Sequence, residues 1–401
     1  MGLNETPSAN RVHIGIFGRR NAGKSSIMNA LTNQQLAIVS DVRGTTTDPV
    51  QKAMELLPIG PVVIIDTPGI DDDGGELGAM RVKKSYQALN KTDVAVIVID
   101  GAEEYPEDIS LIEKVQKKGI PYVIFHNKTD TMQEVCPQKE GHCYGSALLK
   151  TGIDELKNAI VKLAQREDSD KKIVSDLLSP LDIAVLVIPI DAAAPKGRLI
   201  LPQQQTIRDI LEAGAAAVAV KETELKDVLQ KLGTKPKIVI TDSQAFERVA
   251  AVTPRDVLLT SFSILFARYK GSLETAVKGA AEIAKLKSGD RVLISEGCTH
   301  HRQCGDIGTV KLPGWIKKFT GADCRFEWTS GTEFPDDLTG YRLVIHCGGC
   351  MLNEREVKYR YRLAEEQGVP MTNYGTAIAF MHGILERSLE PFGGMSEMLK
   401  Q

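Results

Sequence analysis

The sequence predicts an α/β protein of three domains, in which strands and helices alternate. Short apolar runs of strand length alternate with segments of helical periodicity along the chain. The runs nearest the N-terminus are almost continuously apolar, which is typical of strands buried on both faces. The length of 401 residues also exceeds what one hydrophobic core usually organises, at about 100–200 residues per domain.

Composition narrows the class of protein. Hydrophobic residues make up 42% of the chain and charged residues 25%, and the net charge is −3. This balance is ordinary for a soluble protein and gives no broad attraction to nucleic acid or anionic lipid. No apolar run approaches the roughly 18 residues of a membrane helix, and "MGLNETPSANR" (1–11) lacks the apolar core of a secretory signal. We therefore expect a cytoplasmic protein with no nucleic-acid or membrane partner.

Four apolar runs predict the central strands of the first domain, which we expect to span residues 1–168. They are "VHIGIF" (12–17), "PVVIID" (61–66), "VAVIVID" (94–100) and "PYVIFH" (121–126). The charged run "QREDSDKK" (165–172) follows them and predicts a linker.

The stretch "GRRNAGKSS" (18–26) follows the first strand and opens a helical pattern. This is the context in which G-x-x-x-x-G-K-[ST] forms a phosphate-binding loop. Gly18 and Gly23 let backbone N–H groups face the phosphates, and Lys24 neutralises phosphate charge. The hydroxyl of Ser25 would bind Mg²⁺ at the start of the helix. The residues expected to contact nucleotide here are Gly18, Ala22, Gly23, Lys24, Ser25 and Ser26.

Two further motifs predict that the base is guanine. In "NKTD" (127–130), Asp130 can accept hydrogen bonds from the guanine N1–H and 2-amino groups, which adenine lacks. Asn127 and Lys128 would brace the base and the phosphate loop. Ser146 and Ala147, in "SAL" (146–148), would close over the base.

Two motifs predict the response to the γ-phosphate. In "DTPG" (66–69), Asp66 would hold Mg²⁺ through water, and the N–H of Gly69 would reach the γ-phosphate. The segment "GTTTDP" (44–49) supplies a switch threonine. The complete set predicts a Ras-like P-loop GTPase domain that binds GTP, GDP and Mg²⁺, followed by two smaller α/β domains.

The second domain is expected to span residues 169–268 and the third residues 269–401. The second alternates strand and helix patterns but carries no catalytic constellation. In the third, "RVLISEGC" (291–298) and "YRLVIHCGGC" (341–350) predict strands that run into cysteine-bearing turns. Both turns lie at carboxyl ends of strands, where ligands gather in parallel sheets, so they could meet in space.

Five of the seven cysteines fall within residues 298–350, beside several histidines. Cys347 and Cys350 have C-x-x-C spacing, which lets two thiolates bind one metal ion or cluster edge, and Cys298 offers a third. Buried thiols without a ligand are one interpretation. A structural zinc held by three cysteines and one histidine is the second, and a [4Fe–4S] cluster is the third. Spacing alone does not separate zinc from iron–sulfur.

The first domain resembles the TrmE–Era group of translation-factor-like GTPases over residues 11 to about 168. "GRRNAGKSS", "SDVRGTTTDP", "DTPG", "NKTD" and "SA" occur in the order of that group. The resemblance implies that Thr46 binds Mg²⁺, and that Asn21 contacts K⁺ if this chain is one of the members that potassium activates. Lys24, Thr46 and Gly69 would then be the catalytic residues. Ile70 stands where Ras-like proteins have a water-orienting glutamine, so hydrolysis should be slow and regulatory.

The whole chain resembles the HydF family of [FeFe]-hydrogenase maturation GTPases. The pattern is C-x-H at 298–300, a gap of 45 residues, and "HCGGC" at 346–350, behind a GTPase domain of the TrmE–Era type. The resemblance implies that Cys298, Cys347 and Cys350 bind a [4Fe–4S] cluster. The motif histidines, His300 and His346, would act as fourth ligand, as hydrogen-bonding support or as fold support. His301, Cys304 and Cys324 lie outside the motif and are expected to be structural.

The same resemblance implies a scaffold or carrier that takes part in assembling and delivering the two-iron subcluster of [FeFe]-hydrogenase. Its implied partners are two radical-SAM maturases, the apo-hydrogenase and a second copy of the chain, with a tetramer as a further option. The middle domain, rich in small and aliphatic residues such as "LEAGAAAVAV" (211–220), is the expected dimer surface. A GTPase of ribosome or tRNA maturation with a structural zinc is the alternative, although no RNA-binding module is recognisable.

Overall fold

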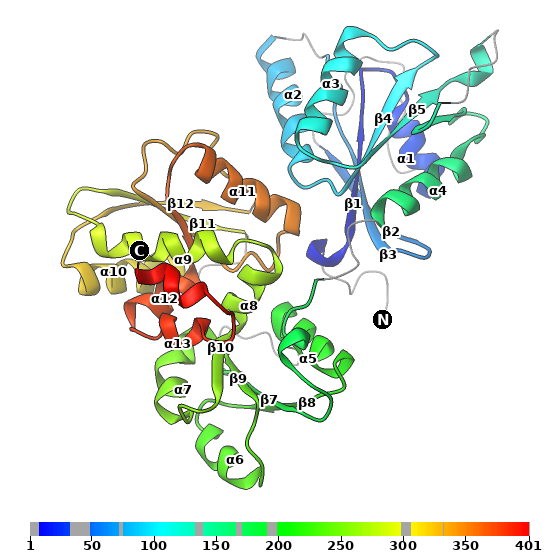
Figure 1. The fold of residues 1–401 in the computed structure, drawn as a ribbon. Helices are drawn as coiled ribbons and strands as arrows, with labels where there is room; N and C mark the ends of the chain where they lie inside the picture. Colours follow the sequence, from blue (N-terminus) through cyan, green and yellow to red (C-terminus); the bar gives the residue numbers. More distant parts are fainter. Residues whose placement is uncertain are drawn as a thin grey trace. The chain divides into compact units, whose positions relative to one another are not determined.

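The computed structural model describes residues 8–32, 49–71, 75–132, 139–165, 171–190, 199–297, 306–331 and 333–400. The chain forms two compact units, residues 1–170 and residues 171–401. The predicted α/β class is confirmed in both units, because each contains sheets of mainly parallel strands joined by helices (Figure 1). The second unit contains two sheets, and the predicted division into three domains stays a prediction.

The first unit is built on one six-stranded sheet in the order β2-β3-β1-β4-β5-β6. All neighbours are parallel except β2 and β3, which are antiparallel. The strands are β1 Val12–Phe17, β2 Val50–Leu56, β3 Gly60–Asp66, β4 Val94–Asp100, β5 Tyr122–Asn127 and β6 His142–Tyr144. The helices are α1 Lys24–Thr32, α2 Gly75–Leu89, α3 Pro106–Lys117 and α4 Ile153–Ala164. The four predicted strands are therefore confirmed to within a residue, and β2 and β6 are additions.

The apolar runs of this sheet are continuous because helices cover both of its faces. Val96 and Val98 of β4 pack in one cluster with residues of α1 and α4. Ile97 and Ile99, which alternate with them, pack in another cluster with residues of α2 and α3. Figure 1 shows the two pairs of helices on opposite sides of the sheet. Successive side chains of a strand point to opposite faces, so a strand buried on both sides must be apolar throughout.

The second unit holds two four-stranded sheets, and every pair of neighbouring strands in them is parallel. In the sheet of order β10-β9-β7-β8, the strands are β7 Ile183–Val187, β8 Ala216–Val220, β9 Ile238–Thr241 and β10 Leu258–Ser261. In the sheet of order β12-β11-β13-β14, they are β11 Arg291–Glu296, β12 Arg325–Ser330, β13 Leu343–His346 and β14 Met371–Asn373.

Nine helices of the described residues cover these two sheets. They are α5 Leu201–Glu212, α6 Leu225–Lys231, α7 Phe246–Val252, α8 Phe262–Tyr269, α9 Leu273–Ala281, α10 Leu312–Thr320, α11 Glu354–Glu366, α12 Tyr374–Met381 and α13 Leu385–Leu389. Gly368 follows helix α11, and its φ of 67° is the left-handed conformation that favours glycine after a helix.

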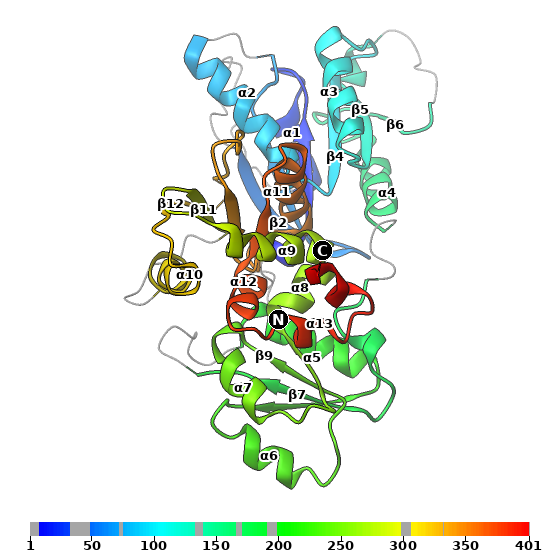
Figure 2. The ribbon, with the colours of Figure 1, turned by 60° about the vertical axis from the view of Figure 1, so that its left-hand side comes forward.

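The end of the chain joins the two sheets of the second unit into one body. Leu385 and Leu389 of α13 belong to the core cluster of the β7–β10 sheet. The guanidinium of Arg387 donates hydrogen bonds of 2.7–2.9 Å to the carbonyl oxygens of Ala250, Thr253 and Pro254, around the end of α7. Figure 2 shows α8, α9, α12 and α13 gathered between the two sheets. No helix among the described residues is long and apolar enough to span a membrane.

Candidate functional site: a phosphate-binding loop and a paired-cysteine loop

The phosphate-binding loop connects β1 to α1 and needs glycine at both of its motif positions. Gly18 has a φ of 148° and Gly23 a φ of 94°. A Cβ at Gly18 would lie 2.3 Å from the carbonyl oxygen of Val98, and one at Gly23 would lie 2.1 Å from the Asn127 side chain. Asn21 between them also has a positive φ, 59°. The loop therefore has the tight backbone that turns N–H groups toward an anion.

Lys24 lies buried inside this loop, with 7% of its surface exposed. Its Nζ donates hydrogen bonds to the carbonyl oxygens of Gly18 at 3.0 Å and Arg19 at 2.7 Å. Burial lowers the pKa of Lys24 to about 8, and the nearby carboxylate of Asp66 opposes that shift. The ammonium is thus held where phosphate oxygens could replace the two carbonyls.

The predicted magnesium residues are in contact with each other. Ser25 Oγ donates to Asp66 Oδ2 at 2.5 Å. Asp66 is 1% exposed, its Oδ1 has no hydrogen-bond partner among the described residues, and burial raises its pKa. A buried carboxylate oxygen without a partner is costly unless a cation or a water completes it. The pair therefore suits Mg²⁺, which prefers hard oxygen ligands.

Asn127 of the predicted base-recognition motif joins three loops. Its side-chain Nδ2 donates to the carbonyl oxygen of Ala22 at 2.9 Å, and its Oδ1 accepts from the N–H of Ala147 at 3.0 Å. Lys128, with a φ of 63°, forms a 2.7 Å ion pair with Asp100. Asp130 is exposed in the following turn, and Ser146 is buried. Asn127 therefore ties the phosphate loop to the segment that contains Ala147.

The turn after β3 lies against the phosphate loop. The N–H of Ile70 donates to the carbonyl oxygen of Gly18 at 3.4 Å, and Asp71 Oδ1 accepts from the N–H of Arg20 at 2.6 Å. A Cβ at Gly69 would lie 2.4 Å from the Arg20 side chain, so a side chain there would displace the loop. This contact can carry a change at the γ-phosphate into the segment that follows. Thr46 lies outside the described residues.

Sequence reasoning missed an ion pair that holds the phosphate loop from outside. Arg19 Nε donates to Asp108 Oδ2 at 2.9 Å, and its guanidinium stacks on the Tyr105 ring at 3.9 Å. Asp108 is completely buried at the start of α3, and burial raises its pKa. The two partners are 89 residues apart, so no local pattern could reveal them.

The lowered pKa of Lys24 predicts a pH dependence of nucleotide binding. We expect the affinity for GDP to fall about tenfold between pH 7 and pH 9, because the free chain loses the Lys24 proton around pH 8. A bound phosphate raises the pKa again, so binding above pH 8 takes up protons. Calorimetry at pH 8.5 in two buffers of different ionisation enthalpy measures that uptake, with GDP alone as the correction. No proton uptake would contradict the expectation.

In the second unit, the strands that lead into the two cysteine-bearing segments are neighbours. Strands β11 and β13 pair in parallel with Ser295 opposite His346, and the N–H of Cys347 continues the pairing by donating to the carbonyl oxygen of Ser295 at 2.8 Å. The N–H of Gly297 donates to Cys347 Sγ at 3.0 Å. Gly297 is the residue before Cys298, which itself lies outside the described residues together with His300, His301 and Cys304.

The C-x-x-C turn is shaped so that N–H groups face sulfur. The N–H of Gly349 donates to Cys347 Sγ at 3.3 Å. Gly349 has a φ of 61°. Burial raises the pKa of the Cys350 thiol, and the neighbouring Cys347 adds to the effect. Two adjacent half-buried thiolates repel each other without a cation, and hydrogen bonds to sulfur are typical of metal–thiolate sites.

Lys270 was not expected at this site. It follows α8, is 8% exposed, and its Nζ donates to the carbonyl oxygens of Gly349 at 2.6 Å and Leu352 at 2.9 Å. It therefore fastens both ends of the C-x-x-C turn and brings a positive charge close to the two sulfurs. Burial lowers its pKa, whereas Cys350 and Cys347 oppose that shift.

His346 is 1% exposed and uses both ring nitrogens. Arg360 NH1 lies 3.1 Å from Nε2, and the carbonyl oxygen of Cys347 lies 2.6 Å from Nδ1. A guanidinium only donates and a carbonyl only accepts, so the ring is neutral with its proton on Nδ1. Arg360 is itself completely buried and also bonds Glu356 and Ser295. In this arrangement His346 supports the turn and has no lone pair left for a metal.

These features define the class of protein: a P-loop GTPase domain joined to an α/β unit with a half-buried pair of cysteines in one turn. Comparison with family models agrees. Residues 13–128 match the 50S ribosome-binding GTPase model, residues 173–271 the hydrogen maturase F dimerization domain, and residues 274–391 the hydrogen maturase F tetramerization domain. The chain belongs to the HydF family of hydrogen maturases, with a GTPase domain of the TrmE–Era type. The predictions of a GTPase and of this family are confirmed, and the two assembly domains support self-association of the chain.

Individual relatives match the GTPase part. The tRNA modification GTPase MnmE of Chromobacterium violaceum is 30% identical over 164 residues, which is 40% of this chain and 36% of that protein. MnmE of Aquifex aeolicus is 34% identical over 155 residues, 38% of this chain and 34% of that protein. The chain thus spans about a third of the length of these relatives.

Among solved structures, the chain is similar to a single-residue variant of Aquifex aeolicus Era bound to GDP·AlF₄⁻, with 20% sequence identity and a TM-score of 0.36. The match covers 61% of this chain and 99% of the Era chain. A single-residue variant of S. thermophilus NFeoB bound to GDP·AlF₄⁻ has 21% identity and a TM-score of 0.32, with 38% of this chain and 64% of that one covered.

Proposed function

We propose that the chain is a GTP-regulated scaffold that holds a [4Fe–4S] cluster on Cys298, Cys347 and Cys350. It would take part in assembling and delivering the two-iron subcluster of [FeFe]-hydrogenase, with two radical-SAM maturases and the apo-hydrogenase as partners. The observation that carries the proposal is the hydrogen bond from the N–H of Gly297 to Cys347 Sγ at 3.0 Å. It brings the residue beside Cys298 to the C-x-x-C turn, although the two segments are 50 residues apart.

The residues around the turn fit such a cluster. Two N–H groups donate to Cys347 Sγ, which stabilises thiolate charge. Lys270 adds a positive charge, and Cys350 is half-buried beside it. When bound, the cluster would supply an iron whose coordination three cysteines leave incomplete, which suits a carrier that exchanges cargo. We assign His346 a supporting role, and His300 stays a candidate for the fourth position.

In the first unit, GTP would bind through Gly18, Ala22, Gly23, Lys24, Ser25 and Ser26 at the phosphates and Asn127, Lys128, Asp130, Ser146 and Ala147 at the base. Mg²⁺ would sit beside Ser25, Asp66 and Thr46, and K⁺ beside Asn21. Ile70 is 9% exposed and has no polar side-chain group to align water, so slow hydrolysis is expected. The bound GTP would thus determine which partner protein binds the chain.

The test is anaerobic reconstitution of the full chain with ferrous iron and sulfide. The proposal expects about four irons and four acid-labile sulfides per chain and a cubane signal in electron paramagnetic resonance after reduction. The comparison sample is the same protein from cells grown in zinc-supplemented medium. A colourless protein that keeps one zinc and takes up no iron would overturn the proposal in favour of a GTPase with a structural zinc.

The positioning role of Lys270 gives a second expectation. Lys270→Met keeps the apolar stem but removes the donor to Gly349 and Leu352. We expect a chelator to remove iron about tenfold faster, because partners of the ligand turn usually matter by that factor or more. Lys278→Met, which loses only an exposed ion pair with Glu274, is the control. Equal rates in both variants would rule out this role.

We also propose that β8 forms part of the dimer surface. It is an edge strand of its sheet, and its sequence, AAVAV, leaves Ala216 and Ala219 exposed. An exposed apolar edge invites pairing with another chain. Ala219→Lys should weaken the dimer at least about tenfold, because it places a charged side chain in the interface on both copies. Val252→Lys on α7 is the control, and light scattering after size exclusion measures both. A dimer unchanged by Ala219→Lys would refute this surface.

A further inference from the structure

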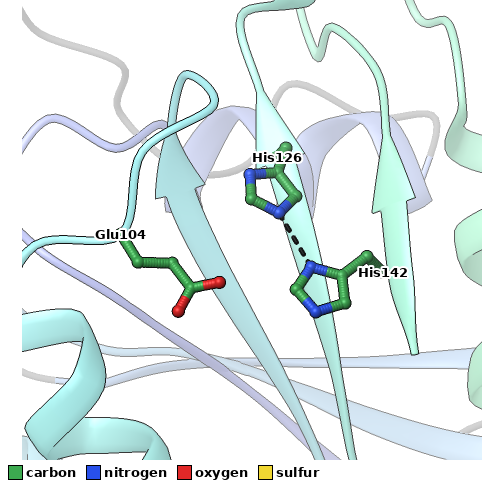
Figure 3. A group of neighbouring side chains, drawn as sticks. All are labelled: Glu104, His126 and His142. Atoms are coloured by element: carbon green, nitrogen blue, oxygen red, sulfur yellow. Dashed lines mark hydrogen bonds between the residues drawn. The ribbon is translucent and has the colours of Figure 1, made fainter. Parts of the chain in front are cut away.

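We propose that Glu104, His126 and His142 form a binding site for a divalent transition-metal ion such as Zn²⁺ in the GTPase domain. The site is separate from the predicted magnesium and iron–sulfur positions. One ligand atom from each of the three residues can be chosen so that all lie within 4.8 Å of one another. Figure 3 shows the carboxylate of Glu104 directed toward the two imidazoles, which lie side by side.

Three different elements supply the ligands. His126 is in β5, His142 begins the neighbouring strand β6, and Glu104 is in the loop before α3. His126 Nε2 lies 2.9 Å from His142 Nδ1. Nitrogen ligands about 2.0–2.1 Å from a tetrahedral zinc are separated by roughly 3.3 Å. A small opening of this pair, with the His142 proton moved from Nδ1 to Nε2, would therefore admit the ion. Two histidines and one glutamate, with water as the fourth ligand, form a common zinc set.

The tautomer of His126 is already set for metal binding. Its Nδ1 lies 2.9 Å from the carbonyl oxygen of Gly101, which can only accept, so Nδ1 carries the proton. The lone pair of Nε2 is therefore directed at His142. A backbone carbonyl that orients a ligand histidine in this way is typical of metal sites. His126 is 3% exposed and stacks on Tyr144 at 4.6 Å, so its ring is fixed.

The charges also favour a divalent ion. A neutral imidazole offers a lone pair to an ion without adding a charge of its own. Glu104 contributes the negative charge, and Lys139 is the one nearby cation that acts on both imidazoles in the described region. Oxygen-preferring Mg²⁺ would gain little from two imidazoles, whereas Zn²⁺ and Co²⁺ suit them.

The location connects this site to the nucleotide loops. His126 directly precedes Asn127, and the N–H of Gly101 donates to the carbonyl oxygen of Asn127 at 3.1 Å. Glu104 directly precedes Tyr105, whose ring packs on Arg19 of the phosphate loop. An ion that ties Glu104 to β5 and β6 would therefore restrain the loop between the base motif and the phosphate loop.

The test uses the full chain with Cys298, Cys347 and Cys350 replaced by serine, so that thiolates cannot bind the probe. We expect one equivalent of Zn²⁺ per chain, with X-ray absorption that reports nitrogen and oxygen ligands at about 2.0–2.1 Å. His142→Gln and Glu104→Gln, both less buried than His126, should each weaken binding at least about tenfold. The matched control is His382→Gln, which removes an imidazole that lies 3.6 Å from one carboxylate, Glu247.

Retained GDP binding checks that each variant is folded. If the variant with three serines fails that check, Co²⁺ is added instead to the chain that keeps its cysteines. Absorption by d–d bands, without a thiolate charge-transfer band, would then report a cobalt site of nitrogen and oxygen ligands. The proposal is overturned if the folded chain holds no such ion, or if His142→Gln and Glu104→Gln bind it as tightly as His382→Gln. The two histidines would then be a structural hydrogen-bonded pair.

Discussion

Lys24→Ala lowers the affinity for GTP by about 10- to 100-fold while leaving the GTPase domain folded. Charge-assisted hydrogen bonds contribute about 1.5–3 kcal/mol each, and one such interaction with phosphate is lost here. In the described structure, the Lys24 ammonium is buried and bonded to the carbonyl oxygens of Gly18 and Arg19. The position of its charge is thus fixed before nucleotide arrives, so little ordering opposes binding.

Equilibrium titration with a fluorescent GTP analogue measures this loss, and the matched control is Lys117→Ala. Lys117 is an exposed lysine in the last turn of α3, so its removal changes net charge equally without touching the loop. Thermal unfolding of both variants separates a binding defect from a folding defect. If Lys24→Ala bound GTP as tightly as Lys117→Ala, the phosphate loop would not be the nucleotide site.

Most of the first unit could be predicted because its rules are local. A strand covered on both faces must be apolar throughout, and a tight phosphate loop needs glycine where φ is positive. Both signals are contiguous in the chain, as in β4 and at Gly18 and Gly23. Strand β2 was not predicted from the sequence. It lies at the sheet edge, where most of its residues are exposed or half-buried, so "VQKAMEL" carries no apolar run.

The contacts that hold the two sites in place could not be predicted, because each contact joins residues far apart in the chain. Lys270 reaches a turn 79 residues later, and Arg19 meets Asp108 after 89 residues. A lysine after an apolar helix or an arginine in a loop is ordinarily a solvated side chain. His126 and His142 likewise become partners only through the pairing of β5 with β6.

Cys347→Ala and Cys350→Ala each remove most of the iron that the reconstituted chain retains, whereas Cys324→Ala retains it. The pair follows β13 at its carboxyl end, in a turn fastened by Lys270 and facing the N–H of Gly297. Loss of either thiolate leaves two cysteines for a cluster that needs at least three protein ligands in this arrangement. Iron and sulfide analysis, with electron paramagnetic resonance of the reduced protein, provides the measurement.

Cys324 makes a demanding control because it lies in the same small sheet. It immediately precedes the six-residue strand β12, which runs parallel to β11, so it stands at the amino end of the sheet. At about 3.3 Å per residue, the two ends of such a strand are roughly 20 Å apart, far beyond the reach of one cluster. Its thiol lies instead 3.8 Å from the carbonyl oxygen of Lys287. If Cys324→Ala lost iron as fully as Cys347→Ala, the cluster would not sit at the carboxyl ends of β11 and β13, and the ligand assignment would fail.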